Sequence, residues 1–253
     1  MMKLEPGITA AMVAIGDELL SGRTRDRNIG HLAGLLTIKG IDLKQVRIVG
    51  DEHQEIVAAV NALRQRYTYV FTSGGIGPTH DDITADAIAA ALGVGIGPDP
   101  AAMALLAAHY RERNLEFTLA RQRMARLPVG ASMIANPVSR APGFKIGNVY
   151  VMAGVPAVFE AMLDTVLASL ETGRVMQSRA IESRFPEGQI GTALGEIAKR
   201  HPQTSIGSYP RFDGANSFST QIVVRARDHA AIDLAAAEIE VMLAAFRIDA
   251  TGS

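Results

Sequence analysis

Residues 69–79 read YVFTSGGIGPT, an apolar run that passes directly into a cluster of glycines. The apolar part is typical of a strand that is buried on both faces of a parallel sheet. Glycines let the backbone turn tightly and approach a ligand closely, and the first turn of a following helix offers unpaired N–H groups to an anion. Because open α/β sheets bind ligands where their strands end, this turn is a candidate phosphate site, although a tight turn without a ligand shows the same pattern.

The alternation of strand-like and helix-like segments extends on both sides of this turn, from residue 8 to residue 170. Three further apolar or β-branched runs are expected strands: 10–15, 41–49 and 149–152. Three segments between the strands carry apolar side chains at helical spacing: 28–39, 54–66 and 82–92. The pattern predicts an α/β fold with a doubly wound, mostly parallel sheet that helices cover.

Two segments depart from this alternation. Residues 98–127 form an expected helical excursion with five arginines between positions 111 and 126, and a solvated face is a commoner use of such a charge run than a phosphate-binding face. After the first domain, residues 1–172, the pattern restarts, and residues 173–253 predict a small α+β module of order βαββα. Its last helix, 232–246, is apolar enough to cover its own sheet and a second subunit, so we expect a homo-oligomer.

Composition narrows the possible partners of the chain. A formal net charge of -1 and a pI near 6.6 give no general attraction for nucleic acid. The absence of cysteine excludes disulfides and thiolate nucleophiles. The first residues lack the features of a signal peptide, and the longest apolar runs are about half of the roughly 20 residues that a membrane helix needs. We therefore expect a cytoplasmic protein with a small-molecule partner and no membrane or nucleic-acid partner.

Acidic side chains follow three of the expected strands. They lie at 17–18, at 51–52 and, after the glycine turn, at 81–82. Each alone is more often a solvated loop residue or a helix cap, and one of Asp81 and Asp82 is expected to cap the following helix. Together they lie at the same edge of the sheet, where two carboxylates beside a phosphate call for a bridging divalent cation such as Mg²⁺. Metal-assisted phosphate chemistry is the interpretation that uses all three pairs.

Five stretches resemble, in order and spacing, the MoaB/MogA-like molybdopterin-binding domain: GDELLSG at 16–22, DRN at 26–28, VGDE at 49–52, TSGGIGPTHDDIT at 72–84 and AGVP at 153–156. Within that family, the aspartate pair, NP at 136–137 and APGF at 141–144 are similar to the amino-terminal part of the competence/damage-inducible protein A (CinA) branch. IGSYP at 206–210 resembles the small domain that follows in CinA and in eukaryotic FAD synthases.

The resemblance implies a set of site residues. Asp82 and Asp51 match the catalytic aspartates of the pterin-adenylating members, and Asp51, Asp81 and Asp82 are the expected metal ligands. The expected ligand-binding residues are Ser73, Gly74, Gly75, Gly77, Thr79, Asp17, Glu18, Ser21, Gly22, Asn28, Gly154 and Pro156. Three positions depart from the family pattern: Ile76 and Arg27 replace threonine, and Ala153 replaces proline.

The resemblance implies three alternative functions. The CinA and FAD-synthase branch implies a divalent-metal-dependent hydrolase, with Mg²⁺ as the expected metal, that acts on the pyrophosphate of ADP-ribose or a similar nucleotide. The pterin-adenylating members imply transfer of an adenylyl group from ATP to molybdopterin. A non-catalytic module that binds a phosphorylated pterin or nucleotide is the third. CinA proteins often carry a carboxy-terminal amidohydrolase domain; no such domain is expected in this sequence, and neither is deamidation.

Overall fold

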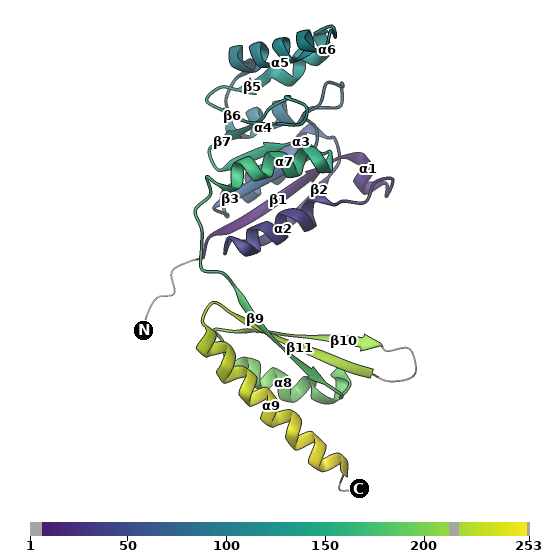
Figure 1. The fold of residues 1–253 in the computed structure, drawn as a ribbon, viewed down its shortest axis with the longest axis vertical. Coiled ribbons are helices and arrows are strands. Elements are labelled where there is room, and N and C mark those ends of the chain that lie inside the picture. The colour runs from purple at the N-terminus through teal and green to yellow at the C-terminus, as the bar shows by residue number, and fades with distance from the viewer. Residues whose placement is uncertain (1–6, 213–217, 252–253) are drawn as a thin grey trace. The chain divides into compact units, whose positions relative to one another are not determined.

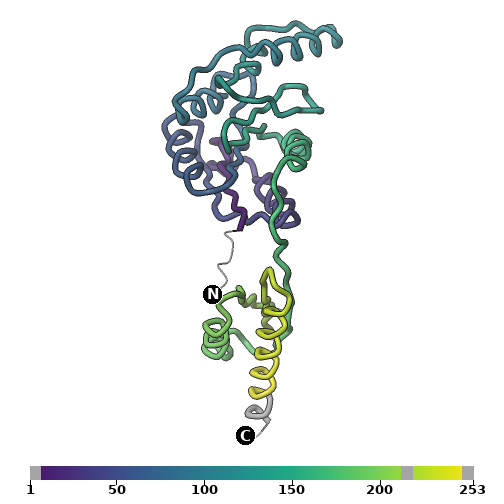
Figure 2. The backbone as a smooth tube through the Cα atoms, turned by 90° about the vertical axis from the view of Figure 1, so that its left-hand side faces the viewer, coloured from purple at the N-terminus to yellow at the C-terminus, as the bar shows by residue number. Residues whose placement is uncertain are grey.

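The chain forms two compact units, with the boundary between Gly173 and Arg174 (Figure 1). The computed structural model describes residues 7–212 and 218–251. None of the helices in these described ranges is long and apolar enough to cross a membrane. The first unit is a sheet with helices on both sides, and the second is a smaller sheet with two helices (Figure 2).

The first unit is built on a six-stranded sheet of order β2-β1-β3-β8-β7-β6. Four strands are parallel: β1 (Thr9–Ile15), β2 (Asp42–Val49), β3 (Tyr69–Ser73) and β8 (Val149–Met152). Two short strands at one side form antiparallel pairs: β7 (Gly143–Ile146) pairs with β8, and β6 (Ser132–Ile134) pairs with β7. The predicted doubly wound, mostly parallel sheet is thus confirmed, and the two short strands with their antiparallel pairing are an addition to it.

Two apolar cores hold the helices against this sheet. The side chains of β1 alternate between them, because successive residues of a strand point to opposite faces. Ala11 and Val13 enter the core beneath α3 (His53–Arg64) and α4 (Thr84–Leu92). Ala10 and Met12 enter the core beneath α2 (Asn28–Ile38) and α7 (Pro156–Leu167). The central strands are therefore buried on both faces, which explains why they read as continuous apolar runs.

The expected helical excursion is partly a β-ribbon. Strands β4 (Ile96–Pro98) and β5 (Arg126–Pro128) pair antiparallel and enclose α5 (Pro100–Glu112), α6 (Leu119–Gln122) and the 3-10 turn η1 (Arg123–Ala125). Ala125 and Leu127 are buried in the core beside α4. The expected solvated basic face holds for exposed Arg111 and Arg113 but not for Arg126, which forms a two-pronged ion pair with Asp86. The charge run spans several elements and so does not share one face.

The second unit has the predicted order βαββα. Its elements are β9 (Gln177–Ser183), α8 (Glu187–Arg200), β10 (Ser205–Phe212), β11 (Phe218–Ala226) and α9 (His229–Thr251). The strands form an antiparallel sheet of order β10-β11-β9, and the described core side chains of α8 and α9 pack together with those of the sheet. Ile232 and Ile239 of α9 are buried, whereas Leu234 and Val241 are exposed, so the helix keeps apolar surface that its own sheet does not cover. Homo-oligomerisation stays a prediction.

Candidate functional site

The four parallel strands of the first unit end at the same edge, and each continues into a loop that carries predicted site residues. Short backbone bonds join the loops at this edge. The N–H of Gly16, after β1, donates to the carbonyl of Val49 at the end of β2, over 3.0 Å. The N–H of Gly74, after β3, donates to the carbonyl of Met152 at the end of β8, over 3.1 Å. The strand polarity thus brings the loops together as expected.

The glycine turn after β3 is packed closely against its neighbours. Gly74 has φ +110°, and a Cβ atom there would lie 2.2 Å from the carbonyl oxygen of Ile15. Gly75 has φ +65°, and a Cβ there would lie 2.2 Å from Oγ1 of Thr84. The Thr84 hydroxyl in turn donates to the Gly74 carbonyl over 3.0 Å. Both glycines are therefore required by the turn itself, and a ligand is not needed to explain them.

Asp17 and Asp51 form a reciprocal pair across the ends of β1 and β2. The N–H of Asp17 donates to Oδ2 of Asp51 over 3.0 Å, and the N–H of Asp51 donates to Oδ1 of Asp17 over 3.3 Å. Burial raises the pKa of Asp51 above its ordinary value, and the charges of Asp17, Glu18 and Asp81 raise it further, against the lowering effect of the Asp17 N–H. The structure thus brings four of the predicted acidic residues into one electrostatic cluster.

Asp82 closes a turn of its own. Its Oδ2 accepts hydrogen bonds from the N–H of Thr79 over 2.8 Å and from the Thr79 hydroxyl over 2.5 Å. Helix α4 begins only at Thr84, its N-cap position is Ile83, and no side chain caps it. The prediction that Asp81 or Asp82 caps this helix is therefore wrong. The loop runs two residues further than expected, because the first helical N–H, of Thr84, donates to the Gly75 carbonyl over 3.0 Å.

The charge of Asp81 acts on Asp51 more strongly than the charge of Asp82 does. Asp81 is among the carboxylates that raise the pKa of Asp51, and Asp82 is not. The pKa of the exposed Asp81 carboxyl is itself lowered, first by the Thr79 hydroxyl and then by its own backbone N–H. Among the described residues, no three histidine or acidic side chains lie close enough to hold a metal ion by themselves. The expected ligand set of Asp51, Asp81 and Asp82 is thus not a preformed cage.

Asn28, the first residue of α2, links the ends of β3 and β8 through hydrogen bonds of its side chain. Its side-chain amide donates to Oγ of Ser73 over 2.7 Å and to the carbonyl of Gly154 over 2.8 Å. The Ser73 hydroxyl also donates to the carbonyl of Ala153 over 3.4 Å. Asn28 is 3% exposed, and its Oδ1 is a buried acceptor without a partner. Buried acceptors are rarely left unpaired, so this atom is a candidate contact for a ligand donor.

The remaining predicted residues lie around this edge without side-chain contacts to the acidic cluster. Ser21 and Gly22 are exposed after the short helix α1 (Asp17–Leu20), and Pro156 is the first residue of α7. Of the three departures from the family pattern, Ile76 packs against both cores and Arg27 is exposed before α2. Replacing a polar threonine by Ile76 therefore exchanges a hydroxyl at the turn for core packing.

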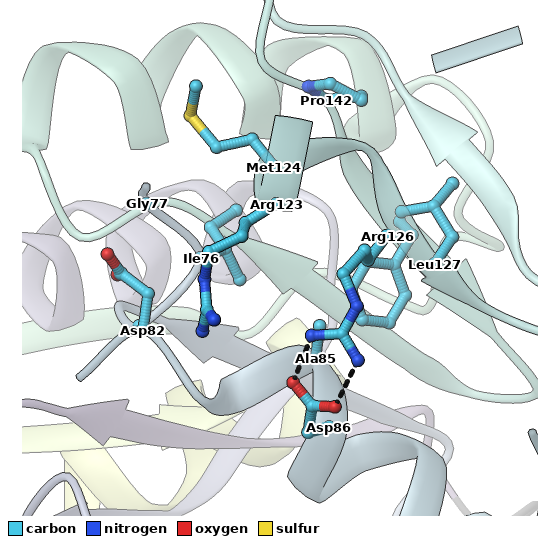
Figure 3. A pocket seen from close by; sticks show the side chains of 12 residues that line it. Ile76, Gly77, Asp82, Ala85, Asp86, Arg123, Met124, Arg126, Leu127 and Pro142 are labelled. Carbon is cyan, nitrogen blue, oxygen red and sulfur yellow. Dashed lines mark hydrogen bonds and ion pairs between the residues drawn. The ribbon is translucent and has the colours of Figure 1, made fainter. Parts of the chain in front are cut away.

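A small cavity beside the glycine turn is lined in part by Asp86, Arg123 and Arg126, which are not among the predicted site residues. Its lining joins Gly75, Gly77 and Asp82 to Asp86, Arg123 and Arg126 (Figure 3). Arg126 and Asp86 are paired at 2.9 Å and 2.7 Å. Arg123 lines the same cavity, and its buried Nε has no hydrogen-bond partner. The arginine run was the available signal, but its period does not tell which arginine turns inward.

Asn28→Ala should destabilise the protein by about 1–3 kcal/mol, because the buried Ser73 hydroxyl and the part-buried Gly154 carbonyl lose their donor. Urea denaturation measures this loss as a lower midpoint at unchanged slope. Ser73→Ala should cost less, since Asn28 then keeps the Gly154 carbonyl. The double variant should cost less than the two single effects added together, because the two side chains share one hydrogen bond. Full additivity would show that the bond contributes nothing.

Known proteins resemble the chain over both units. Residues 11–172 match the family model described as "Probable molybdopterin binding domain", and residues 175–251 match "FAD synthase, middle domain". A protein of Aeropyrum pernix is 33% identical over 211 residues, which cover 80% of this chain and 79% of the relative. A CinA-like protein of Desulfosudis oleivorans is 33% identical over 214 residues, which cover 80% of this chain and 52% of the relative. The crystal structure of CinA from Thermoplasma acidophilum, whose function is described as unknown, is 31% identical with a TM-score of 0.59, and the match covers 64% of this chain and 96% of that one.

Proposed function

The chain belongs to the probable molybdopterin-binding domain family, and from this premise we propose that it binds a phosphorylated nucleotide or pterin and cleaves a nucleotide pyrophosphate with a divalent cation. The observation that carries the proposal is the reciprocal pair of Asp17 and Asp51 beside the glycine turn. In this pair, one oxygen of each carboxylate accepts a hydrogen bond from the backbone N–H of the other residue. The other two oxygens, Oδ2 of Asp17 and Oδ1 of Asp51, have no partner among the described residues.

The charges at this edge suit a divalent cation. Burial is the main cause of the raised pKa of Asp51, and the neighbouring carboxylates raise it further; a bound cation would offset both effects. Mg²⁺ keeps several waters and is usually bound through one or two carboxylates and the phosphates of the substrate, so it needs no cage of protein ligands. Free oxygens of Asp17 and Asp51 fit this mode. When bound, the cation would supply Lewis-acid activation of a phosphoryl oxygen and of a water molecule.

The protein's own groups would position the ligand. Gly77 has no Cβ, and this lets the Asp82 carboxylate lie against the glycine turn, because a Cβ there would lie 2.6 Å from Oδ2 of Asp82. Thr79 holds that carboxylate in place with two hydrogen bonds. The buried Oδ1 of Asn28 is an unpaired acceptor beside the ends of β3 and β8, where an N–H or hydroxyl of the ligand would satisfy it.

Adenylyl transfer to molybdopterin is the second candidate, and the description of the family model favours it. It would use the same edge of the sheet, since both reactions break a phosphoanhydride bond beside a cation. The two candidates differ in the acceptor of the adenylyl group. Water takes it from ADP-ribose and ribose 5-phosphate leaves, or the pterin phosphate takes it from ATP and pyrophosphate leaves. The identity of the product therefore separates them.

The test is product analysis with the full chain and a panel of substrates. ADP-ribose, a dinucleoside pyrophosphate, and ATP together with molybdopterin are each incubated with Mg²⁺ or with a chelator. We expect ADP-ribose to yield AMP and ribose 5-phosphate only when the metal is present. An adenylylated pterin would replace hydrolysis by adenylyl transfer, and binding of any of these ligands without turnover would contradict both enzymatic functions in favour of a binding module.

A further inference from the structure

Arg123 is a charged side chain at the site that the proposed chemistry does not use. It opens the 3-10 turn η1 and lines the cavity beside the glycine turn, where Figure 3 draws it between Asp82 and the Arg126–Asp86 pair. Its Nε is buried without a hydrogen-bond partner, and Arg123 has no ion pair within residues 7–212 and 218–251. Buried donors in native proteins nearly always have an acceptor, so this one lacks an acceptor that a ligand can supply.

The neighbouring arginines are already engaged. Arg126 donates to both carboxylate oxygens of Asp86. Arg121 donates to the carbonyl of Glu116, and its guanidinium lies 4.4 Å from the ring centre of Tyr110. Arg123 is thus the arginine of this segment that faces the cavity with donors to spare.

The position of Arg123 is fixed by the core. Two residues further along the turn, Ala125 is fully buried, and its carbonyl accepts the N–H of Asp99 over 2.8 Å. Met124, between them, packs against the same core as Phe144. The backbone that carries Arg123 is therefore held before any ligand arrives, which reduces the ordering cost of binding.

We propose that Arg123 binds a phosphate oxygen of the ligand whose pyrophosphate lies over the glycine turn. This inference rests on the proposed function and adds to it the protein cation that recognises the phosphate. A guanidinium presents two parallel N–H groups that match two phosphate oxygens. The cavity, of about 20 Å³, has room for roughly one water molecule, so it admits a phosphate oxygen and not a whole nucleotide. The positive charge also offsets Asp82, which otherwise repels the phosphate.

Calorimetric titration of the full chain with inorganic pyrophosphate and with ADP-ribose, each with Mg²⁺, tests this assignment. Arg123→Gln should weaken binding of both by about 10- to 100-fold, the loss expected for a hydrogen bond to a charged group. Arg123→Lys keeps the charge but lacks the planar guanidinium, so its affinity should lie between those of the wild type and Arg123→Gln. Arg113→Gln is the matched control, because it removes the same charge from an exposed position on the same segment and should change affinity less than about twofold.

Thermal unfolding of each variant separates binding from folding. Arg123 makes no ion pair within the described ranges, so Arg123→Gln should melt close to the wild type; if it does not fold, Arg123→Lys carries the test. Wild-type affinity in the folded Arg123 variants would overturn the assignment even in a chain that hydrolyses ADP-ribose. If the Arg123 variants lose pyrophosphate binding and the wild type cleaves no nucleotide, the phosphate-binding role of Arg123 is supported and the proposed hydrolysis is contradicted. A wild type that binds neither probe would overturn both.

Discussion

Asp51→Asn should lower metal-dependent turnover of the nucleotide substrate by more than about 100-fold, since even residues that only orient a metal ligand cost 10–100-fold when they are replaced. Asn is nearly isosteric with Asp, and its side-chain oxygen still accepts the N–H of Asp17. The loop pair therefore keeps its geometry and loses the charge that we assign to cation binding. Steady-state kinetics over a range of Mg²⁺ concentrations measures the effect. Unchanged turnover would remove Asp51 from the site.

The same substitution should not destabilise the protein. The pKa of Asp51 is raised in the folded protein above its ordinary value of 3.8, so the proton binds more tightly to the folded than to the unfolded chain. Ionisation of Asp51 therefore costs stability as the pH rises through this range, and at neutral pH the cost is present in full. Asp51→Asn should melt at the same temperature as the wild type or higher at pH 7, and the difference should disappear as the pH falls below 3.8, where the carboxyl is protonated in both the folded and the unfolded chain.

Glu52→Gln is the matched control for both measurements. Glu52 is the next residue, it is exposed, and its side chain makes no capping bond to α3. The variant removes the same charge from the same loop without touching the Asp17–Asp51 pair. Turnover within about twofold of the wild type is expected, because an exposed charge outside the pair is screened by solvent. An equal loss in both variants would show that general electrostatics, not a bound cation, is being measured.

The sequence predicts the frame of the fold and the edge that carries the site, because both follow from patterns within single segments. Strands β3 and β8 read as continuous apolar runs since both of their faces are buried. The meeting of Asp17 with Asp51 follows from the parallel polarity of two predicted strands. The sequence does not predict strands β6 and β7, because three or four residues at the margin of a sheet are too few to show a period of two.

The features of the site that the sequence does not predict depend on contacts between segments that are distant in the chain. The late start of α4 depends on the bond from the Thr84 N–H to the Gly75 carbonyl, and no local signal distinguishes this from a cap by Asp82. The turning of Asp82 toward Thr79 follows from that longer loop. The sequence places Arg123 in a charge run typical of a solvated face, because only the burial of Ala125 and Leu127 in the core determines which arginines face inward. The start of α4 and the orientations of Asp82 and Arg123 are therefore set by tertiary packing and not by local sequence.

Gly74→Ala should produce the largest loss of stability at this edge. The residue has φ +110°, which costs a residue with a side chain about 1–3 kcal/mol. The new Cβ would also lie 2.2 Å from the backbone carbonyl oxygen of Ile15, in the neighbouring strand. The backbone of β1, which is paired on both sides, cannot give way as the end of a side chain can, so overpacking adds a similar cost. Urea denaturation should show a lower midpoint, and ligand affinity should fall as the glycine turn is displaced.

Gly93→Ala separates the two causes. Gly93 ends α4 with φ +70°, and a Cβ there would meet nothing within 4 Å. It should therefore lose only the conformational part, about 1–2 kcal/mol, with unchanged ligand affinity. The excess loss in Gly74→Ala then measures the close approach of β1 to the glycine turn. If both variants lose the same free energy of unfolding, the contact with Ile15 is relieved by a shift of the turn, and affinity alone reports whether that shift reaches the site.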